Sequence, residues 1–153
     1  MAANPQLLKD IRLKLIHREL RPVYTVDTDL RRVPNHPEPL ADLGIVDGFD
    51  NLGQAVVLRL LTPLGELAPL AHPEYGSRLY ELIGSPNTAT TRNLAKLYIL
   101  ESLQLEPRIQ SVIEVVVEPA PGTRDRINVQ VAVKPVAETQ VVRIGPFTLE
   151  LAT

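Results

Sequence analysis

The sequence lacks cysteine and tryptophan altogether, and it contains only two phenylalanines and four tyrosines among its 153 residues. Without cysteine, the chain has no disulfide framework, no thiolate zinc site and no cysteine nucleophile. Its three histidines, His17, His36 and His72, lie far apart, and none is paired at a metal-ligand spacing. We therefore expect no metal and no other cofactor, and a fold that rests on packing alone.

An excess of basic charge and long apolar runs are missing as well. Sixteen basic residues stand against 18 acidic ones, which gives a formal net charge of −2 and no broad positive field to attract nucleic acid. The longest apolar runs, such as AVVLRLL at residues 55–61, are far shorter than the roughly 20 residues that cross a bilayer. The first fifteen residues lack the apolar core of a signal peptide, so export by the general route is not expected either.

The composition is that of a soluble globular chain, with 44% hydrophobic and 22% charged residues, and it predicts one folded domain with an arm. Leucines and isoleucines at helical spacing predict a helix over residues 5–20. Four prolines then predict an extended arm up to residue 41. We expect residues 1–41 to form this helix and arm, and residues 42–153 to form the domain. The arm either wraps its own domain or reaches another subunit, and the residues do not decide between the two.

The middle of the chain predicts two to three helices. Residues 50–61 are apolar nearly all round, with Gln54 and Arg59 as the polar exceptions, so this helix must be buried on several sides. A turn at TPLGEL, with Gly65 available for a positive φ, precedes a short helix that ends at Gly84. A longer helix begins among Thr88, Thr90 and Thr91 and is ended by Pro107.

Beyond Pro107 the period changes from helical to alternating, which predicts strands. The first strand has one face made of Ile109, Ile113, Val115 and Val117. The second has one made of Ile127, Val129, Val131 and Val133, and a last run at residues 141–151 contains the pair Gly145-Pro146, which indicates an edge strand or a bulge. The fold class predicted is α+β: an N-terminal helix and extended arm, two to three helices, then a three-stranded antiparallel sheet with an open edge.

Charged residues cluster at the joint between helix and strand, where Glu106, Pro107 and Arg108 are consecutive. The simple interpretation is a charged helix end, a helix-stopping proline and a solvated arginine. A glycosidase would need two carboxylates across a cleft, one with a raised pKa. The candidates are Glu66, Glu74, Glu81, Glu101 and Glu106, but Arg108 beside Glu106 favours the ionised carboxylate. With few aromatic residues to stack on sugars, we do not expect an enzyme.

Three segments, NLGQAVVLRLLTPLGEL, HPEYGSRLYELIG and LESLQLEPRIQSVIEVVV, follow one another in a recognisable order. In order and approximate spacing they resemble the baseplate wedge family of contractile phage tails. That family carries a lysozyme-like label and includes the baseplate protein of type VI secretion and the sheath initiators of tail-like injection particles. The resemblance covers roughly residues 42–151, and Leu67 departs from it, because many members have arginine there. The motif residues outside the joint are Gly65, Glu66, Pro73, Glu74, Tyr75 and Gly76.

The resemblance implies a structural, non-enzymatic protein that joins the baseplate wedge to the sheath and starts the first sheath ring. Glu106, Pro107 and Arg108 would contact the helical core bundle of the wedge. The open edge of the C-terminal sheet would accept a sheath strand, through Val141, Val142, Arg143, Ile144, Phe147, Thr148 and Leu149. It also implies six copies and assembly in the cytoplasm as part of a phage tail or tail-like particle. The arm lies outside the resemblance, and its partner stays open among the inner tube or hub, the wedge and its own domain. The alternative function, suggested by the family label, is a peptidoglycan-cleaving glycosidase.

Overall fold

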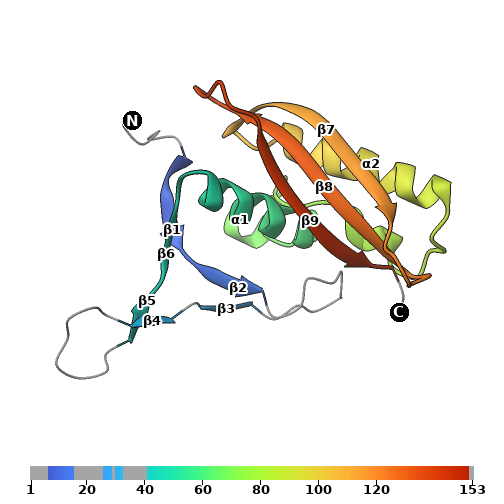
Figure 1. Ribbon diagram of the computed structural model, residues 1–153, viewed down its shortest axis with the longest axis horizontal. Helices are drawn as coiled ribbons and strands as arrows, with labels where there is room; N and C mark the ends of the chain where they lie inside the picture. Colours follow the sequence, from blue (N-terminus) through green and yellow to red (C-terminus); the bar gives the residue numbers. More distant parts are fainter. Residues whose placement is uncertain (1–6, 16–25, 29, 33–40, 152–153) are drawn as a thin grey trace.

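The computed structural model describes residues 7–15, 26–28, 30–32 and 41–151. It confirms the α+β class: two α-helices are followed by a three-stranded antiparallel sheet near the C-terminus (Figure 1). In the described part of the chain, no helix is long and apolar enough to cross a membrane.

The helices lie close to where the sequence places them. Thr88 caps the longest one, because its side chain accepts a hydrogen bond of 3.2 Å from the backbone N–H of Thr91. That helix ends three residues before Pro107, as expected of a proline that disfavours helix in the residue before it. The helical elements are α1 (Gly48–Leu61), the short 3₁₀ helices η2 (Ala68–Leu70) and η3 (Leu79–Leu82), and α2 (Ala89–Gln104).

The sheet has the order β7-β8-β9, so β8 is central and the other two strands are its edges. The inward side chains of β8 (Ile127, Val129, Val131 and Val133) are fully buried, which confirms their predicted alternation. They share one core with the buried faces of α1, η3 and α2. The strands are β7 (Ile109–Pro119), β8 (Arg126–Pro135) and β9 (Val142–Glu150).

One inward position predicted for β7 is wrong. Ile113 is 55% exposed, although the alternation placed it on the core face. The pairing of β7 with β8 shifts register between Ile109 and Ser111 and again between Val112 and Glu114. Each irregularity changes which side chains face the core, and Val112 packs against the core instead.

The predicted N-terminal helix is also wrong where the structure describes it, because residues 9–11 and 13–15 are strands. Ile11, Leu13 and Leu15 fit an alternating pattern as well as a helical one, and pairing with distant strands selects the extended form. The remainder of the predicted helix, and the four prolines of the arm, lie outside the described residues. The first six strands are three residues each: β1 (Lys9–Ile11), β2 (Leu13–Leu15), β3 (Val26–Thr28), β4 (Leu30–Arg32), β5 (Ala41–Leu43) and β6 (Ile45–Asp47).

These short strands form three antiparallel pairs, β1 with β6, β2 with β3, and β4 with β5. Residues 7–13, which include β1, are attached to α1 by two of its side chains. Asn51, which is buried, donates a hydrogen bond of 2.9 Å to the carbonyl of Leu7. Gln54 donates to the carbonyl of Ile11 and accepts from the N–H of Leu13, both at 2.9 Å. Contacts therefore cross the boundary expected at residue 41. Gln54, one of the two polar residues noted in this helix, has a structural role.

Candidate functional site

The joint between α2 and β7 is built around one buried carboxylate. Glu106 is only 4% exposed, and each of its oxygens is bound by a different arginine. Nε of Arg108 donates to Oε1 at 2.6 Å, and Nε of Arg59 donates to Oε2 at 3.2 Å. Pro107, between Glu106 and Arg108 in the sequence, is exposed, and Arg108 is half-buried. The joint thus turns Glu106 inward and leaves Pro107 and part of Arg108 at the surface.

The ionised form of Glu106 is favoured in this setting. Burial by itself raises the pKa of a carboxyl group, because it disfavours the charged form. Here the hydrogen bond and charge of Arg108, together with the charge of Arg59, outweigh burial and hold the pKa of Glu106 below its ordinary value. This is the reverse of what a general acid needs, since such a group must keep its proton near neutral pH.

Arg59 is the member of this cluster that the sequence did not assign. It comes from α1, lies 4.6 Å above the ring of Tyr75, and is 6% exposed. Its Nη1 atom is buried without a hydrogen-bond partner among the described residues. The sequence did mark Arg59 as unusual, because it is one of two polar residues in an otherwise apolar helix. A cation there predicts a buried partner, although it does not say which carboxylate supplies the partner.

The motif loop between α1 and η3 meets the joint through Tyr75. Gly65 has a positive φ of 85° as predicted, whereas Glu66, Pro73 and Glu74 are exposed. Gly76 has a φ of 113°, and a Cβ atom there would lie 2.6 Å from the carbonyl oxygen of Thr62. Only glycine fits such an approach.

Two hydroxyl groups bind the same loop to the two long helices. Ser77 donates to the carbonyl of Leu60 at 2.6 Å, and Ser102 donates to the carbonyl of Gly76 at 2.7 Å. The three motif segments, which are separate in the sequence, are therefore joined in one connected cluster. That cluster comprises the end of α1, the loop before η3 and the joint after α2.

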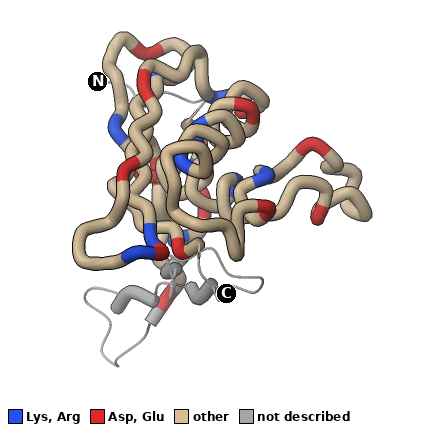
Figure 2. The backbone as a smooth tube through the Cα atoms, turned by 90° about the vertical axis from the view of Figure 1, so that its right-hand side faces the viewer, with Lys and Arg blue, Asp and Glu red and all other residues tan. Residues whose placement is uncertain are grey.

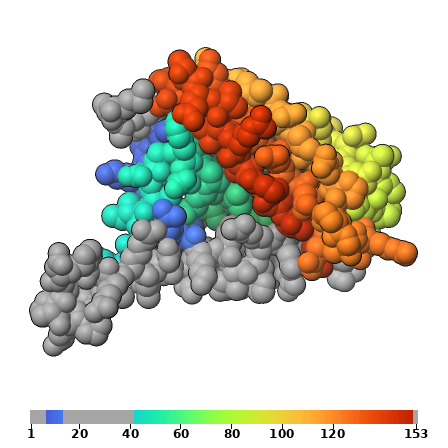
Figure 3. Space-filling view, viewed as in Figure 1, coloured from blue at the N-terminus to red at the C-terminus, as the bar shows by residue number. Residues whose placement is uncertain are grey.

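The predicted strand-addition edge is β9. Within the described part of the chain, β9 pairs with β8 alone. Ile144, Phe147 and Leu149 are buried in the core, so these three residues offer a partner mainly their backbone groups. Val141 and Arg143 are exposed, Val142 is half-buried, and Thr148 donates a hydrogen bond of 2.9 Å to Asn128. Figure 3 shows β9 in red at the surface, next to α1.

A glycine shapes this edge. At Gly145 and Pro146, β9 has two residues where β8 has one, so the register shifts between Val129 and Val131. Gly145 has a φ of 102°, and a Cβ atom there would lie 2.7 Å from the carbonyl oxygen of Val129. The prediction that this pair marks an edge strand or a bulge is confirmed on both counts.

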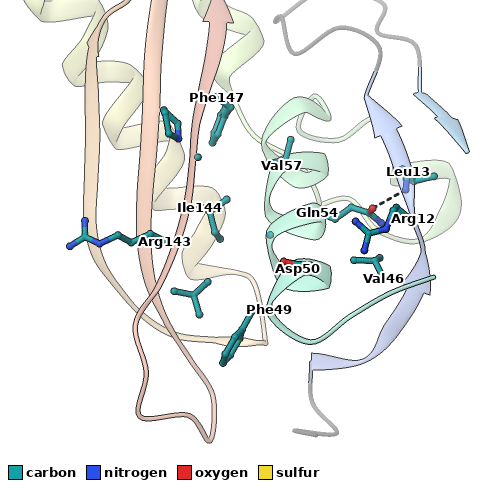
Figure 4. A pocket seen from close by; sticks show the side chains of 14 residues that line it. Arg12, Leu13, Val46, Phe49, Asp50, Gln54, Val57, Arg143, Ile144 and Phe147 are labelled. Atoms are coloured by element: carbon teal, nitrogen blue, oxygen red, sulfur yellow. Dashed lines mark hydrogen bonds between the residues drawn. The ribbon is translucent and has the colours of Figure 1, made fainter. Parts of the chain in front are cut away.

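A groove of about 830 Å³ lies along β9 and continues over the outer side of α1 to Arg12, Leu13 of β2 and Val46 of β6 (Figure 4). On the sheet side it is lined by Ile144 and Phe147, and on the helix side by Phe49, Gly53 and Val57. Figure 4 shows β9 and α1 side by side, with the N-terminal strand beyond the helix. The groove is thus formed by apolar side chains beside a strand edge.

Charge in the groove is sparse. Its charged lining residues are Arg12, Arg143 and the single carboxylate Asp50. The glycosidase alternative needs a pair of carboxylates facing each other, and Glu106 does not line this groove. The other glutamates considered, Glu66, Glu74, Glu81 and Glu101, are exposed and do not line it either. Over the rest of the described backbone, acidic and basic residues are interspersed (Figure 2).

No family model matches the chain, and no curated protein matches it at a significant level. Among the residues that the structure describes, no three histidine, cysteine, aspartate or glutamate side chains gather as a metal site would require.

Proposed function

We propose that this chain is a structural baseplate component of a contractile injection system. It links the baseplate wedge to the sheath and templates the first sheath ring by strand addition at its C-terminal sheet. The single observation that most supports this is the exposed edge of β9 with an apolar groove beside it. Proteins normally cover such an edge or break it up, because it invites association. In β9 the bulge at Gly145 and Pro146 interrupts the edge once. On either side of it, within the described residues, the edge is unpaired and suited to receive a strand.

The sheath-facing part of this proposal can be tested by site-specific cross-linking. Deletion of residues 141–153 is unsuitable, because it removes Ile144, Phe147 and Leu149 from the core. The chain has no cysteine, so Arg143→Cys provides a unique position for a benzophenone label on β9. Asn93→Cys, on the exposed side of α2, provides the control.

The labelled, tagged proteins are introduced into the native host and irradiated, and cross-linked partners are identified by mass spectrometry. We expect sheath protein attached to the label at position 143 and not to the label at position 93. Equal attachment from both positions, or attachment of no assembly protein from position 143, would contradict the proposal.

The second contact is with the wedge, at the joint. Because Glu106 is buried, Pro107 and Arg108 form the contacting surface, and Glu106 fixes the direction of the Arg108 side chain. Proline restricts the backbone beside it. Arginine offers a planar fork suited to a carboxylate of the partner. Arg59 fixes Glu106 from the buried side of the joint and is itself packed against the ring of Tyr75.

Two substitutions at Arg108 test the wedge contact. Arg108→Lys keeps the charge and loses the fork, and Arg108→Ala loses both, while Arg59 still neutralises Glu106 in either case. We expect both variants to fold and to recover wedge proteins about tenfold less well, with alanine the weaker. Unchanged recovery by folded variants would refute this contact, as would recovery by an unfolded one.

Six copies around a central tube and assembly in the cytoplasm belong to the same proposal. They follow from the resemblance and not from the contacts described above. A mass measurement of the isolated baseplate tests the copy number directly.

A further inference from the structure

The groove along β9 has a gap in its helical wall. Phe49 and Val57 are half-buried on α1, and Gly53 lies midway between them, one turn from each. Glycine in a helix interior is less favourable than alanine, so Gly53 weakens α1. No close contact within the described chain requires a glycine at this position. A Cβ atom at Gly53 would meet nothing within 4 Å. The space above it is therefore open to a side chain from outside.

The spacing of this wall matches a β-strand. Residues four apart in a helix advance by about 6 Å along its axis. Side chains on one face of a strand repeat at about 6.6 Å. A strand added to β9 would lie along α1 (Figure 4). Three successive inward side chains would then meet Phe49, the gap at Gly53 and Val57, and the gap would take the largest of the three.

The far wall of the groove holds a cation with an unused donor. The Nε atom of Arg12 is buried and has no hydrogen-bond partner among the described residues. Its backbone N–H is bound to the carbonyl of Gly44 at 2.7 Å, and Gln54 holds the residues on either side. Figure 4 shows the Arg12 side chain directed toward α1, between Gln54 and Asp50. A buried N–H without a partner is unfavourable, and a carboxylate is its strongest acceptor.

We propose that this groove binds one extended strand of a partner subunit, apolar at its inward positions, with a carboxylate side chain that pairs with Arg12. The unpartnered Nε of Arg12 is the feature that favours a carboxylate, because Arg143 is directed away from α1 and lies 3.9 Å from Glu114. The inference rests on the proposed function, because it takes strand addition at β9 as the mode of binding. It adds the chemistry by which the correct strand is selected.

The test uses the full chain and blocked nine-residue peptides as probes. Each peptide has valine at inward positions, leucine at the central one and threonine at outward ones. Glutamate is placed at each position in turn and compared with glutamine at that position. Fluorescence anisotropy measures affinity, and hydrogen exchange of the β9 amides reports whether a strand has been added.

Three variants locate the site. Gly53→Lys fills the gap, and Asn93→Lys adds the same charge at an exposed position of α2. Arg12→Met retains an unbranched side chain and removes the charge. We expect the best glutamate peptide to bind at least tenfold more tightly than its glutamine counterpart and to protect the β9 amides. Gly53→Lys should abolish binding, Asn93→Lys should leave it unchanged, and Arg12→Met should remove the preference for glutamate while the protein stays folded.

Protection without a preference for glutamate would overturn the selection by Arg12 and leave strand addition standing. If no peptide protects β9 while position 143 still cross-links to sheath, the groove assignment fails and the proposed function survives. If both experiments fail, the proposed function fails with it. A dimer of the free protein that Gly53→Lys dissociates would show that a second copy fills the groove, and would also overturn the partner-strand assignment.

Discussion

The joint after α2 and the groove beside β9 differ in whether their main polar groups find partners within the chain. At the joint, the carboxylate of Glu106 is buried and each oxygen is bound by an arginine of the same chain. At the groove, one edge of β9 has no strand beside it within the described residues, and the buried Nε of Arg12 has no partner. The carboxylate of the joint is therefore satisfied within the chain, and only Nη1 of Arg59 lacks a partner among the described residues, whereas the groove leaves both a strand edge and a charged donor unpaired.

This difference separates the buried Glu106, which stabilises the fold, from surfaces suited to binding, namely the groove and the exposed part of Pro107 and Arg108. Breaking a buried ion pair leaves an uncompensated charge and is strongly destabilising. Adding a side chain to an open surface has little cost. Substitution of Glu106 should therefore change the free energy of unfolding most, and substitutions in the groove should change binding most.

The largest effect is expected for Glu106→Gln, which leaves Arg59 and Arg108 without their shared carboxylate. We expect the free energy of unfolding to fall by about 3 kcal/mol, measured by urea denaturation. Glu101→Gln is the control, because Glu101 lies close by on α2 and is exposed. A loss of less than about 1 kcal/mol would place Glu106 with ordinary surface ion pairs and remove the contrast between the two regions.

The next effect concerns the shape of the β9 edge. Gly145→Ala would bring a Cβ atom within 2.7 Å of a backbone oxygen at a φ of 102°, so we expect a loss of about 2–3 kcal/mol. Gly122→Ala also has a positive φ but open space around it, and it should lose only about 1 kcal/mol. Thermal unfolding of the two variants compares them directly. Equal losses would mean that the close approach to β8 does not constrain the edge.

A change of opposite sign is expected in the groove. Gly53→Ala should raise the free energy of unfolding by about 0.5–1 kcal/mol, because alanine favours the helix and its Cβ atom meets open space. Denaturation in urea measures this gain. A destabilised variant would show that the gap at Gly53 is already filled, and the groove would then resemble the joint.

The sequence predicted the elements whose signals are local. The alternation of β8, the start of α2 among Thr88, Thr90 and Thr91, and its end before Pro107 all depend on residues a few positions apart. The N-terminal strands were missed because Leu7, Leu8, Ile11 and Leu15 satisfy a helical spacing. Pairing with β6, more than 30 residues away, decides the outcome, and no local pattern contains that information.

The two candidate sites show the same limit. Glu106 and Arg108 stand out because they are charged and lie two apart, but the partner that completes the joint, Arg59, is 47 residues from Glu106. The composition of α1 showed that Arg59 was unusual and could not name its partner. Gly53 gave no signal at all, since its importance comes from the empty space beside it.

The smallest effect should appear in acid. Arg108 and Arg59 hold the pKa of Glu106 below its ordinary value of 4.5, despite burial. As the pH falls, the unfolded chain therefore takes up the proton first. The stability that Glu106 contributes is complete above about pH 4.5 and is lost as the pH falls through its lower folded value. Between about pH 5 and 3, the wild-type free energy of unfolding should fall more steeply than that of Glu106→Gln, while Glu101→Gln should follow the wild type. Parallel curves for all three would mean that the arginines do not favour the charged carboxylate, and that the joint is not the closed ionic cluster its distances indicate.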